Sequence, residues 1–89
     1  MKFQLSPAFN ERYDALSKEA QKRADKSLRL FANNARHPSL KFKKVHQSDP
    51  IYSIRAGLDY RLVGRKEQDC MVWFWVGKHD KYERLLANM

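Results

Sequence analysis

Three arginines lie on two short segments near the middle of the sequence. Arg55 ends the run of residues 51–55, and Arg61 and Arg65 follow within the next β-like run. Side chains alternate between the two sides of a β-strand, so we expect these arginines on one side and the apolar residues between them on the other. Guanidinium groups stay protonated and bind phosphate through paired hydrogen bonds. The spacing therefore predicts an arginine cluster suited to a polynucleotide backbone.

The net charge supports a polyanionic partner. Lys and Arg number 18 against 10 Asp and Glu, which gives +8, and residues 35–66 hold eight of the bases and only two of the acids. Such a field attracts nucleic acid or an acidic protein. An ordinary solvated basic surface is the alternative, because charge runs alone are weak evidence. The remaining candidates for phosphate contacts are all basic and lie near the arginines: Lys41, Lys43, Lys44, Arg65 and Lys78.

A second group of reactive residues lies in residues 76–82, where the last apolar run ends. His79 can donate or accept a proton near neutral pH, and Tyr82 offers a hydroxyl and a ring on which a base could stack. Gly77 is expected to let the backbone turn as it leaves the strand. A histidine at a strand end is also commonly a plain surface residue, and that alternative remains open.

The other chemically capable residues point to no metal or cofactor. His37 and His46 have no partner at metal-ligand spacing, and Cys70 is the single cysteine. Cys70 opens the most apolar run and is expected to be a small buried hydrophobe. Trp73 and Trp75 are expected in the core, although they could stack on bases if they faced the basic side.

The first third of the chain must supply the helices that support these residues. Residues 2–5 predict a short strand, and Ser6-Pro7 predicts the start of a helix. Apolar residues then recur at spacings of three and four over residues 9–16 and again over 20–31, with a break near Ser17. The pattern predicts a helical hairpin that ends at residues 33–34.

From residue 40 onward the pattern changes to that of strands. Residues 40–43, 51–56, 60–63 and 70–76 alternate or are continuously apolar, and short polar separators join them. We expect a four-stranded antiparallel meander with the helices on one face and the arginines on an uncovered face. A short helix over residues 80–86 should follow.

Length and composition limit the class of protein. Eighty-nine residues with 43% apolar and 31% charged side chains suit one domain with one core, residues 1–89, and not a disordered chain. The longest apolar run is too short to cross a bilayer, and the first residues do not read as a signal peptide. We expect a soluble, cytoplasmic protein that makes no contact with membranes.

Several short motifs occur in the order and spacing of a known family. They are Asn-Asn-Ala-Arg-His-Pro-Ser-Leu at residues 33–40, Ile-Tyr-Ser-Ile-Arg at 51–55, Asp-Tyr-Arg-Leu-Val at 59–63 and Val-Gly-Lys-His-Asp at 76–80. With them, the chain resembles the RelE/ParE superfamily of bacterial type II toxins over nearly its whole length. The resemblance implies an α+β fold, in which an N-terminal strand and a helical hairpin pack on one face of the meander and a short C-terminal helix follows.

The resemblance also implies two possible functions. RelE-like members cut mRNA in the ribosomal A site without a metal, whereas ParE-like members poison DNA gyrase. The leading interpretation is a ribosome-dependent mRNA endoribonuclease that needs no cofactor and inhibits translation. The alternative is a non-catalytic gyrase inhibitor or an inactive relative that only binds an antitoxin. A cognate antitoxin, the ribosome and mRNA are the implied partners, and a heterotetramer with the antitoxin is possible.

By position in these motifs, the resemblance assigns roles to four residues. Arg61 matches an arginine on the scissile phosphate, and Arg55 matches a basic residue one strand earlier. His79 matches the position near the leaving group, and Tyr82 is a candidate for a tyrosine that stacks on the substrate.

Two positions depart from the family pattern. Gly64 stands where many relatives have a tyrosine, and Ser53 stands where RelE has a lysine that could help to activate the attacking hydroxyl. The second strand also lacks the Glu that some relatives keep there. If the 2′-OH of the RNA is the nucleophile, the arginines would hold the phosphate and His79 would be the acid. The base stays open between Lys43 and His46.

Overall fold

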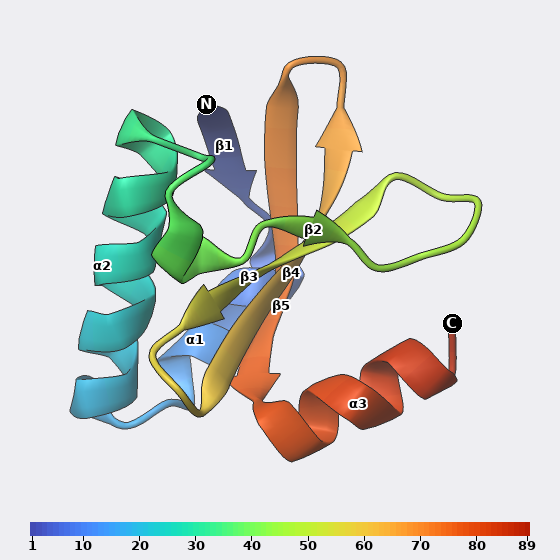
Figure 1. Ribbon diagram of the computed structural model, residues 1–89. Helices are drawn as coiled ribbons and strands as arrows, with labels where there is room; N and C mark the ends of the chain where they lie inside the picture. Colours follow the sequence, from blue (N-terminus) through green and yellow to red (C-terminus); the bar gives the residue numbers. More distant parts are fainter.

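The computed structural model describes all 89 residues as a sheet with helices on both faces. Figure 1 shows the elements in sequence colours. In chain order they are β1 (Lys2–Leu5), α1 (Pro7–Asp14), α2 (Lys18–Asn33), the 3-10 turn η1 (Pro38–Leu40), β2 (Lys43–Lys44), β3 (Ile51–Ala56), β4 (Tyr60–Glu67), β5 (Cys70–Lys78) and α3 (His79–Ala87). No helix is both long and apolar enough to cross a membrane.

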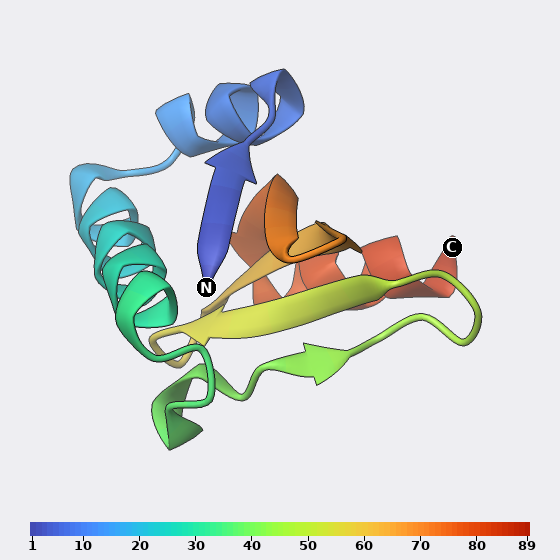
Figure 2. The ribbon, with the colours of Figure 1, turned by 90° about the horizontal axis from the view of Figure 1, so that it is seen from above.

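The five strands form one mixed sheet in the order β1-β5-β4-β3-β2. Strands β2 to β5 are successive antiparallel neighbours, which confirms the predicted meander. The expected N-terminal strand is also present, and it pairs parallel with β5 at the edge of the sheet. Figure 2 shows α1 and α2 on one side of the twisted sheet and α3 on the other.

Serine caps set the starts of the two N-terminal helices. Ser6 Oγ accepts the backbone N–H of Phe9 at 3.2 Å, and Ser17 Oγ accepts that of Ala20 at 3.2 Å. A capping hydroxyl satisfies an N–H that has no partner within the helix. The predicted break near Ser17 is therefore confirmed, and α2 begins directly after it.

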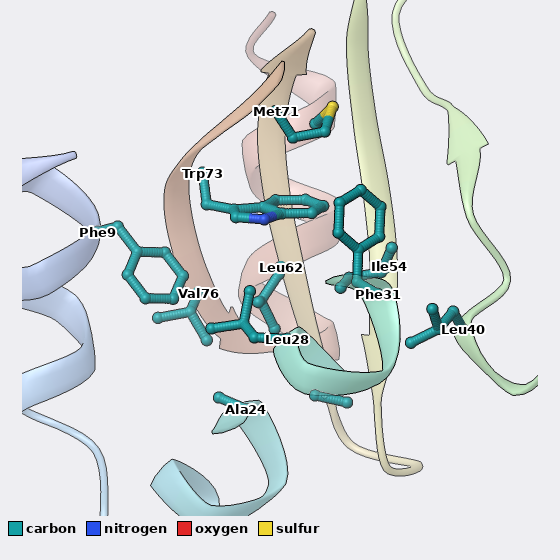
Figure 3. Packing of buried hydrophobic residues seen from close by; sticks show 11 residues of the cluster. Phe9, Ala24, Leu28, Phe31, Leu40, Ile54, Leu62, Met71, Trp73 and Val76 are labelled. Atoms are coloured by element: carbon teal, nitrogen blue, oxygen red, sulfur yellow. The ribbon is translucent and has the colours of Figure 1, made fainter. Parts of the chain in front are cut away.

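The main core lies between the sheet and the helices α1 and α2. Phe31 of α2 packs edge-on against Trp73 of β5, with ring centroids 5.2 Å apart, and Figure 3 shows both rings among their neighbours. Eleven buried residues form this cluster: Phe9, Ala24, Leu28, Phe31, Leu40, Ile54, Ala56, Leu62, Met71, Trp73 and Val76. The apolar spacing of residues 9–31 therefore marked the face of the hairpin that the sheet covers.

The segment before the meander differs from the prediction. Residues 40–43 were expected to form a strand, but Leu40 ends η1 and is buried, and only Lys43–Lys44 pairs with β3. Lys41 has a left-handed backbone with φ of 49°, which ends the turn and interrupts any extended run. Burial of Leu40 in the main core has more influence here than the local alternation.

The second face of the sheet is partly covered, so the expectation of an uncovered face is wrong. Helix α3 folds back across it and builds a second, smaller buried cluster from Ile51, Val63, Trp75 and Tyr82. The chain enters α3 directly from β5 with no loop, which places the helix beside the strand it has just left.

An irregularity in β5 divides the two tryptophans between the faces. Val63 pairs with Trp75, but the next residue of β4, Gly64, pairs with Trp73, so Phe74 has no partner in the register. An extra residue of this kind reverses the alternation. Trp73 therefore lies in the main core and Trp75 in the second cluster, and both are buried as expected.

Candidate functional site

The register of β3 and β4 brings two of the predicted arginines together. Arg55 and Arg61 are direct cross-strand partners, and Ser53, two residues before Arg55, pairs with Lys43 of β2. Direct partners share a face of the sheet. The resulting pocket has a volume of about 330 Å³ and is lined by Lys41, Phe42, Lys43, Ser53, Ile54, Arg55 and Arg61. We call it the arginine pocket.

Arg61 is held in place by backbone carbonyls. Its Nη1 donates to the Tyr60 oxygen at 2.9 Å and to the Leu58 oxygen at 3.4 Å. Burial lowers the pKa of Arg61 from its ordinary value, and the charge of Arg55 lowers it further, while Tyr82 and Asp59 act in the opposite direction. A guanidinium remains protonated in proteins. The pocket therefore holds a partly desolvated positive charge that an anion would stabilise.

Arg55 carries an unpartnered donor. Its Nε atom is buried and makes no hydrogen bond within the protein. A buried N–H without an acceptor costs roughly 1–3 kcal/mol. Because Arg61 is the cross-strand partner of Arg55, one anion between them could accept hydrogen bonds from both side chains.

His79 is the first residue of α3. Its backbone N–H donates to the Asp59 oxygen at 2.8 Å, which ties the start of the helix to the β3–β4 turn. Its side chain is half exposed, and its Nε2 lies 2.9 Å from the Glu83 carboxylate one helical turn later. The geometry therefore gives an accessible imidazole with a carboxylate that orients it.

Tyr82 lies deeper in the protein than its predicted role requires. It is 5% exposed, and its hydroxyl is 3.1 Å from Ser53 Oγ. Its ring centroid is 5.9 Å from the guanidinium carbon of Arg61 and 5.9 Å from the His79 ring. In this conformation the ring is not open to a base. Tyr82 instead connects the arginine pocket to His79.

Three of the basic residues predicted to bind phosphate lie outside this pocket. Lys44 pairs with Tyr52 and Lys78 pairs with Tyr60, which puts both lysines on the opposite face from Arg61. Arg65 shares the face of Arg61 but lies four residues along β4, about 13 Å away. There its guanidinium is 4.0 Å from the Asp49 carboxylate. The positive charge of the middle third is therefore spread over several surfaces.

The two candidate bases differ in position. Lys43 lines the arginine pocket. His46 lies in the β2–β3 loop, where its Nδ1 accepts the backbone N–H groups of Ser48 and Asp49. His37 similarly accepts the N–H of Ser39 and caps the turn η1. Both of these histidines order loops, and only Lys43 is brought to the arginines.

The two glycines of interest make room for aromatic rings. A Cβ at Gly77 would lie 2.7 Å from the ring of Trp75, and one at Gly64 would lie 2.7 Å from that of Trp73. Gly77 continues strand β5, so the expectation that it turns the chain is wrong. Gly64 pairs with Tyr52 on the face covered by α2, away from Arg61. A side chain at position 64 would therefore not point into the arginine pocket.

Two residues that shape this region are absent from the predicted site. Glu83 could have been found, because it lies four residues after His79 and such pairs meet on a helix. Arg12 gave no such signal. Its Nε donates to the Val76 oxygen at 2.8 Å across 64 residues of sequence, and its guanidinium lies 4.6 Å from the centre of the Trp75 ring.

The comparisons with known proteins agree with this fold. A family model described as a ParE-like toxin domain matches residues 18–84. YafQ from E. coli strain BL21(DE3) superposes with a TM-score of 0.73 at 13% identity, covering 91% of this chain and 96% of YafQ. A chain of the RelB-RelE antitoxin-toxin complex from Methanococcus jannaschii gives 0.72 at 17%, covering 96% and 98%.

The isolated E. coli RelE toxin gives a TM-score of 0.63 at 17% identity, covering 99% of this chain and 98% of RelE. No curated protein sequence matches the chain. At these identities the structural likeness shows a shared fold, and the family model extends over most of the sequence.

Proposed function

The chain belongs to the ParE-like toxin domain family of the RelE/ParE superfamily, and we propose that it is a ribosome-dependent endoribonuclease that cuts mRNA without a metal ion. The observation that carries this proposal is the arginine pocket, in which Arg55 and Arg61 are cross-strand partners, Lys43 lines the wall, and Arg61 contacts the ring of Tyr82 beside His79. Cations and an acid–base group next to one pocket are what cleavage of a phosphodiester requires.

The proposed reaction uses the RNA's own 2′-hydroxyl as nucleophile. Its oxygen forms a bond to the neighbouring phosphorus, the bond from phosphorus to the 5′ oxygen breaks, and the products are a 2′,3′-cyclic phosphate and a 5′-hydroxyl. Negative charge grows on the two non-bridging oxygens in the transition state. Arg55 and Arg61 stabilise that charge, and loss of one such donor typically lowers the rate about 10²–10³-fold.

His79 supplies the proton that the leaving 5′ oxygen takes up. The Glu83 carboxylate lies 2.9 Å from Nε2 and orients the ring, and half of the side chain remains open to a substrate. The contact between His79 and Tyr82, and that between Tyr82 and Arg61, sets the position of the acid relative to the phosphate.

Lys43 is the base in this proposal. It shares the pocket with both arginines, whereas His46 is engaged with the backbone of its own loop. As the base, the neutral amine of Lys43 would take up the proton that the 2′-hydroxyl releases when its oxygen bonds to phosphorus. Orientation of the mRNA by the ribosome would supply the remaining rate, because correct placement of the hydroxyl lowers the barrier substantially.

An antitoxin is the proposed protein partner. The M. jannaschii relative forms a complex with its antitoxin RelB. An acidic, partly disordered antitoxin segment would suit a chain with a net charge of +8 and could cover the arginine pocket. We propose a cytoplasmic complex of this kind, with a heterotetramer as one possible assembly.

Gyrase inhibition is the second candidate function, and one observation favours it. Ser53, at the position of a family lysine, is 2% exposed and has its hydroxyl engaged by Tyr82, so it cannot act as a base. The test is to add the protein to a purified translation system and, separately, to a gyrase supercoiling assay. The ribonuclease proposal expects new mRNA 5′ ends only when ribosomes are translating, and unchanged supercoiling. Inhibited supercoiling with intact mRNA would reverse the assignment.

A further inference from the structure

A second basic cavity adjoins the arginine pocket on the other side of β3. It has a volume of about 610 Å³ and lies between α2, the turn η1 and the β3–β4 turn. The β3–β4 turn lies beside α2 in both views of the ribbon (Figures 1 and 2). Arg55 lines this cavity as well as the arginine pocket. The two cavities therefore share one residue, whose backbone oxygen accepts a hydrogen bond from Ser27 Oγ of α2 at 2.9 Å.

Two further cations from α2 line the second cavity. Arg23 lies against Gly57, whose backbone has φ of 69°, and a Cβ at Gly57 would come within 3.2 Å of the Arg23 side chain. Arg23 also pairs with Glu19 at 3.1 Å. Lys26 follows three residues later on the same side of the helix. The glycine in the turn thus makes room for the guanidinium of α2 to reach the end of β3.

Arg55 lies at the boundary between the two cavities. The Nε of Arg55 is buried and has no acceptor in the protein. Among the residues that line the second cavity, Arg23, Lys26 and Arg55 oppose a single acid, Asp59. A free anion would fill one cavity, but a polynucleotide carries successive phosphates and can occupy both. The arrangement therefore fits a chain of phosphates that passes Arg55.

We propose that the cavity between α2 and the β3–β4 turn is a second RNA subsite, which holds the phosphates next to the scissile one. This inference rests on the proposed function, because it takes the arginine pocket as the place of the scissile phosphate. Arg23 and Lys26 bind the neighbouring backbone, and Arg55 contacts phosphate at the junction. Phosphate contacts of this kind fix the register of a nucleic acid without reading its sequence.

The experiment measures how binding depends on salt. The probe is a single-stranded RNA oligomer with 2′-methoxy groups, which has no free nucleophile and cannot be cleaved. The test variant carries Arg23→Gln and Lys26→Gln, and the matched control carries Lys18→Gln and Lys22→Gln, the same loss of charge on the same helix outside the cavity. Each lost phosphate contact lowers the slope of log K against log salt by about 0.7.

The proposal expects the slope of the test variant to fall by about 1.4 and that of the control to stay near the wild-type value. Restoring charge with Arg23→Lys and Lys26→Arg should restore most of the slope. If the slope fell equally in the test and control variants, only the overall charge would attract RNA. If the slope fell in neither variant, RNA would not bind in the cavity. Both results would overturn the subsite.

Failure of the subsite can be told apart from failure of the proposed function. If the wild type cleaves mRNA but the test variant keeps the full slope, the subsite is wrong and the ribonuclease stands. If the wild type binds the oligomer through Arg23 and Lys26 but cleaves nothing on translating ribosomes, the subsite stands as a binding site and the ribonuclease assignment fails.

Discussion

The two faces of the sheet differ in what they bury. The face under α1 and α2 holds eleven buried apolar residues, whereas the face under α3 holds four, next to Arg55, Arg61 and Lys43. The same alternation along β3 and β4 supplies both sets of side chains. Stability and chemistry are therefore divided between opposite sides of the same strands.

The face under α3 also keeps its polar groups in unfavourable surroundings. Arg61 has a lowered pKa because it is partly buried beside Arg55, and the Nε of Arg55 lacks an acceptor. Groups of this kind cluster at functional sites, because a ligand relieves the cost. The larger core on the opposite face provides the stability that lets the sheet tolerate them.

The largest effect on stability is expected from the face under α1 and α2. Leu28→Ala or Phe31→Ala should lower the free energy of unfolding by roughly 2–5 kcal/mol, because each removes a buried side chain and leaves a cavity. Urea denaturation measures the loss. Leu58→Ala is the control, since Leu58 is 76% exposed and its truncation should change stability by less than about 0.5 kcal/mol. Unchanged midpoints for both core variants would show that the helix faces are misassigned.

The next effect concerns cleavage rather than stability. His79→Gln should lower single-turnover cleavage roughly 10²–10⁴-fold, because a general acid contributes about that much, while ribosome binding persists. His79→Arg keeps a charge but does not readily donate a proton. Full cleavage by His79→Arg would show that the position acts through charge alone.

A smaller change in stability is expected at the hydrogen bond between α3 and the sheet. Tyr82→Phe removes the hydrogen bond to buried Ser53 and should cost about 1 kcal/mol of unfolding free energy. Tyr52→Phe is the matched control, because it removes a tyrosine hydroxyl from the opposite face of the strand that holds Ser53, where Tyr52 pairs with Gly64. Equal stability of the two variants would mean that the Ser53–Tyr82 contact does not hold α3 to the sheet.

The smallest effect should appear only in alkaline solution. The hydrogen bond to Asp25 raises the pKa of Tyr13 above 10.0, and burial raises it further. A raised pKa in the folded protein stabilises it fully below the unfolded value of about 10. That stability is lost as the pH rises through the folded pKa. Tyr13→Phe should therefore lose less stability above pH 10 than the wild type, as measured by urea denaturation at a series of pH values. If the free energy of unfolding fell equally with pH in both proteins, the result would contradict the hydrogen bond between Tyr13 of α1 and Asp25 of α2.

Local pattern was enough to predict the helices and the shared face of Arg55 and Arg61. The spacing of apolar residues in α2 depends on the helix itself, and the alternation of β3 and β4 depends on the strands themselves. Both signals are contained in a few neighbouring residues. For that reason the sequence was enough to predict that Arg55 and Arg61 lie on the same face of the sheet.

The remaining features depend on contacts between distant residues. The register shift opposite Gly64 sends Trp73 and Trp75 to different faces, and no short pattern in β5 marks it. The return of α3 across the sheet buries Tyr82, and Arg12 reaches Val76 from α1. Tertiary packing decides such features. The burial of Tyr82 and the contribution of Arg12 therefore could not be predicted from the sequence.

The role of Arg61 in cleavage is tested most directly by comparing it with Arg65, an arginine on the same strand and the same face. Translating ribosomes are incubated with the wild type, Arg61→Ala or Arg65→Ala at equal concentration, and new mRNA 5′ ends are mapped. We expect cleavage by the wild type and by Arg65→Ala, because Arg65 lies about 13 Å from Arg61 along β4. We expect the cleavage rate of Arg61→Ala to be about 10²–10³-fold lower. Cleavage by Arg61→Ala at the wild-type rate, or no new ends with the wild type, would contradict this role.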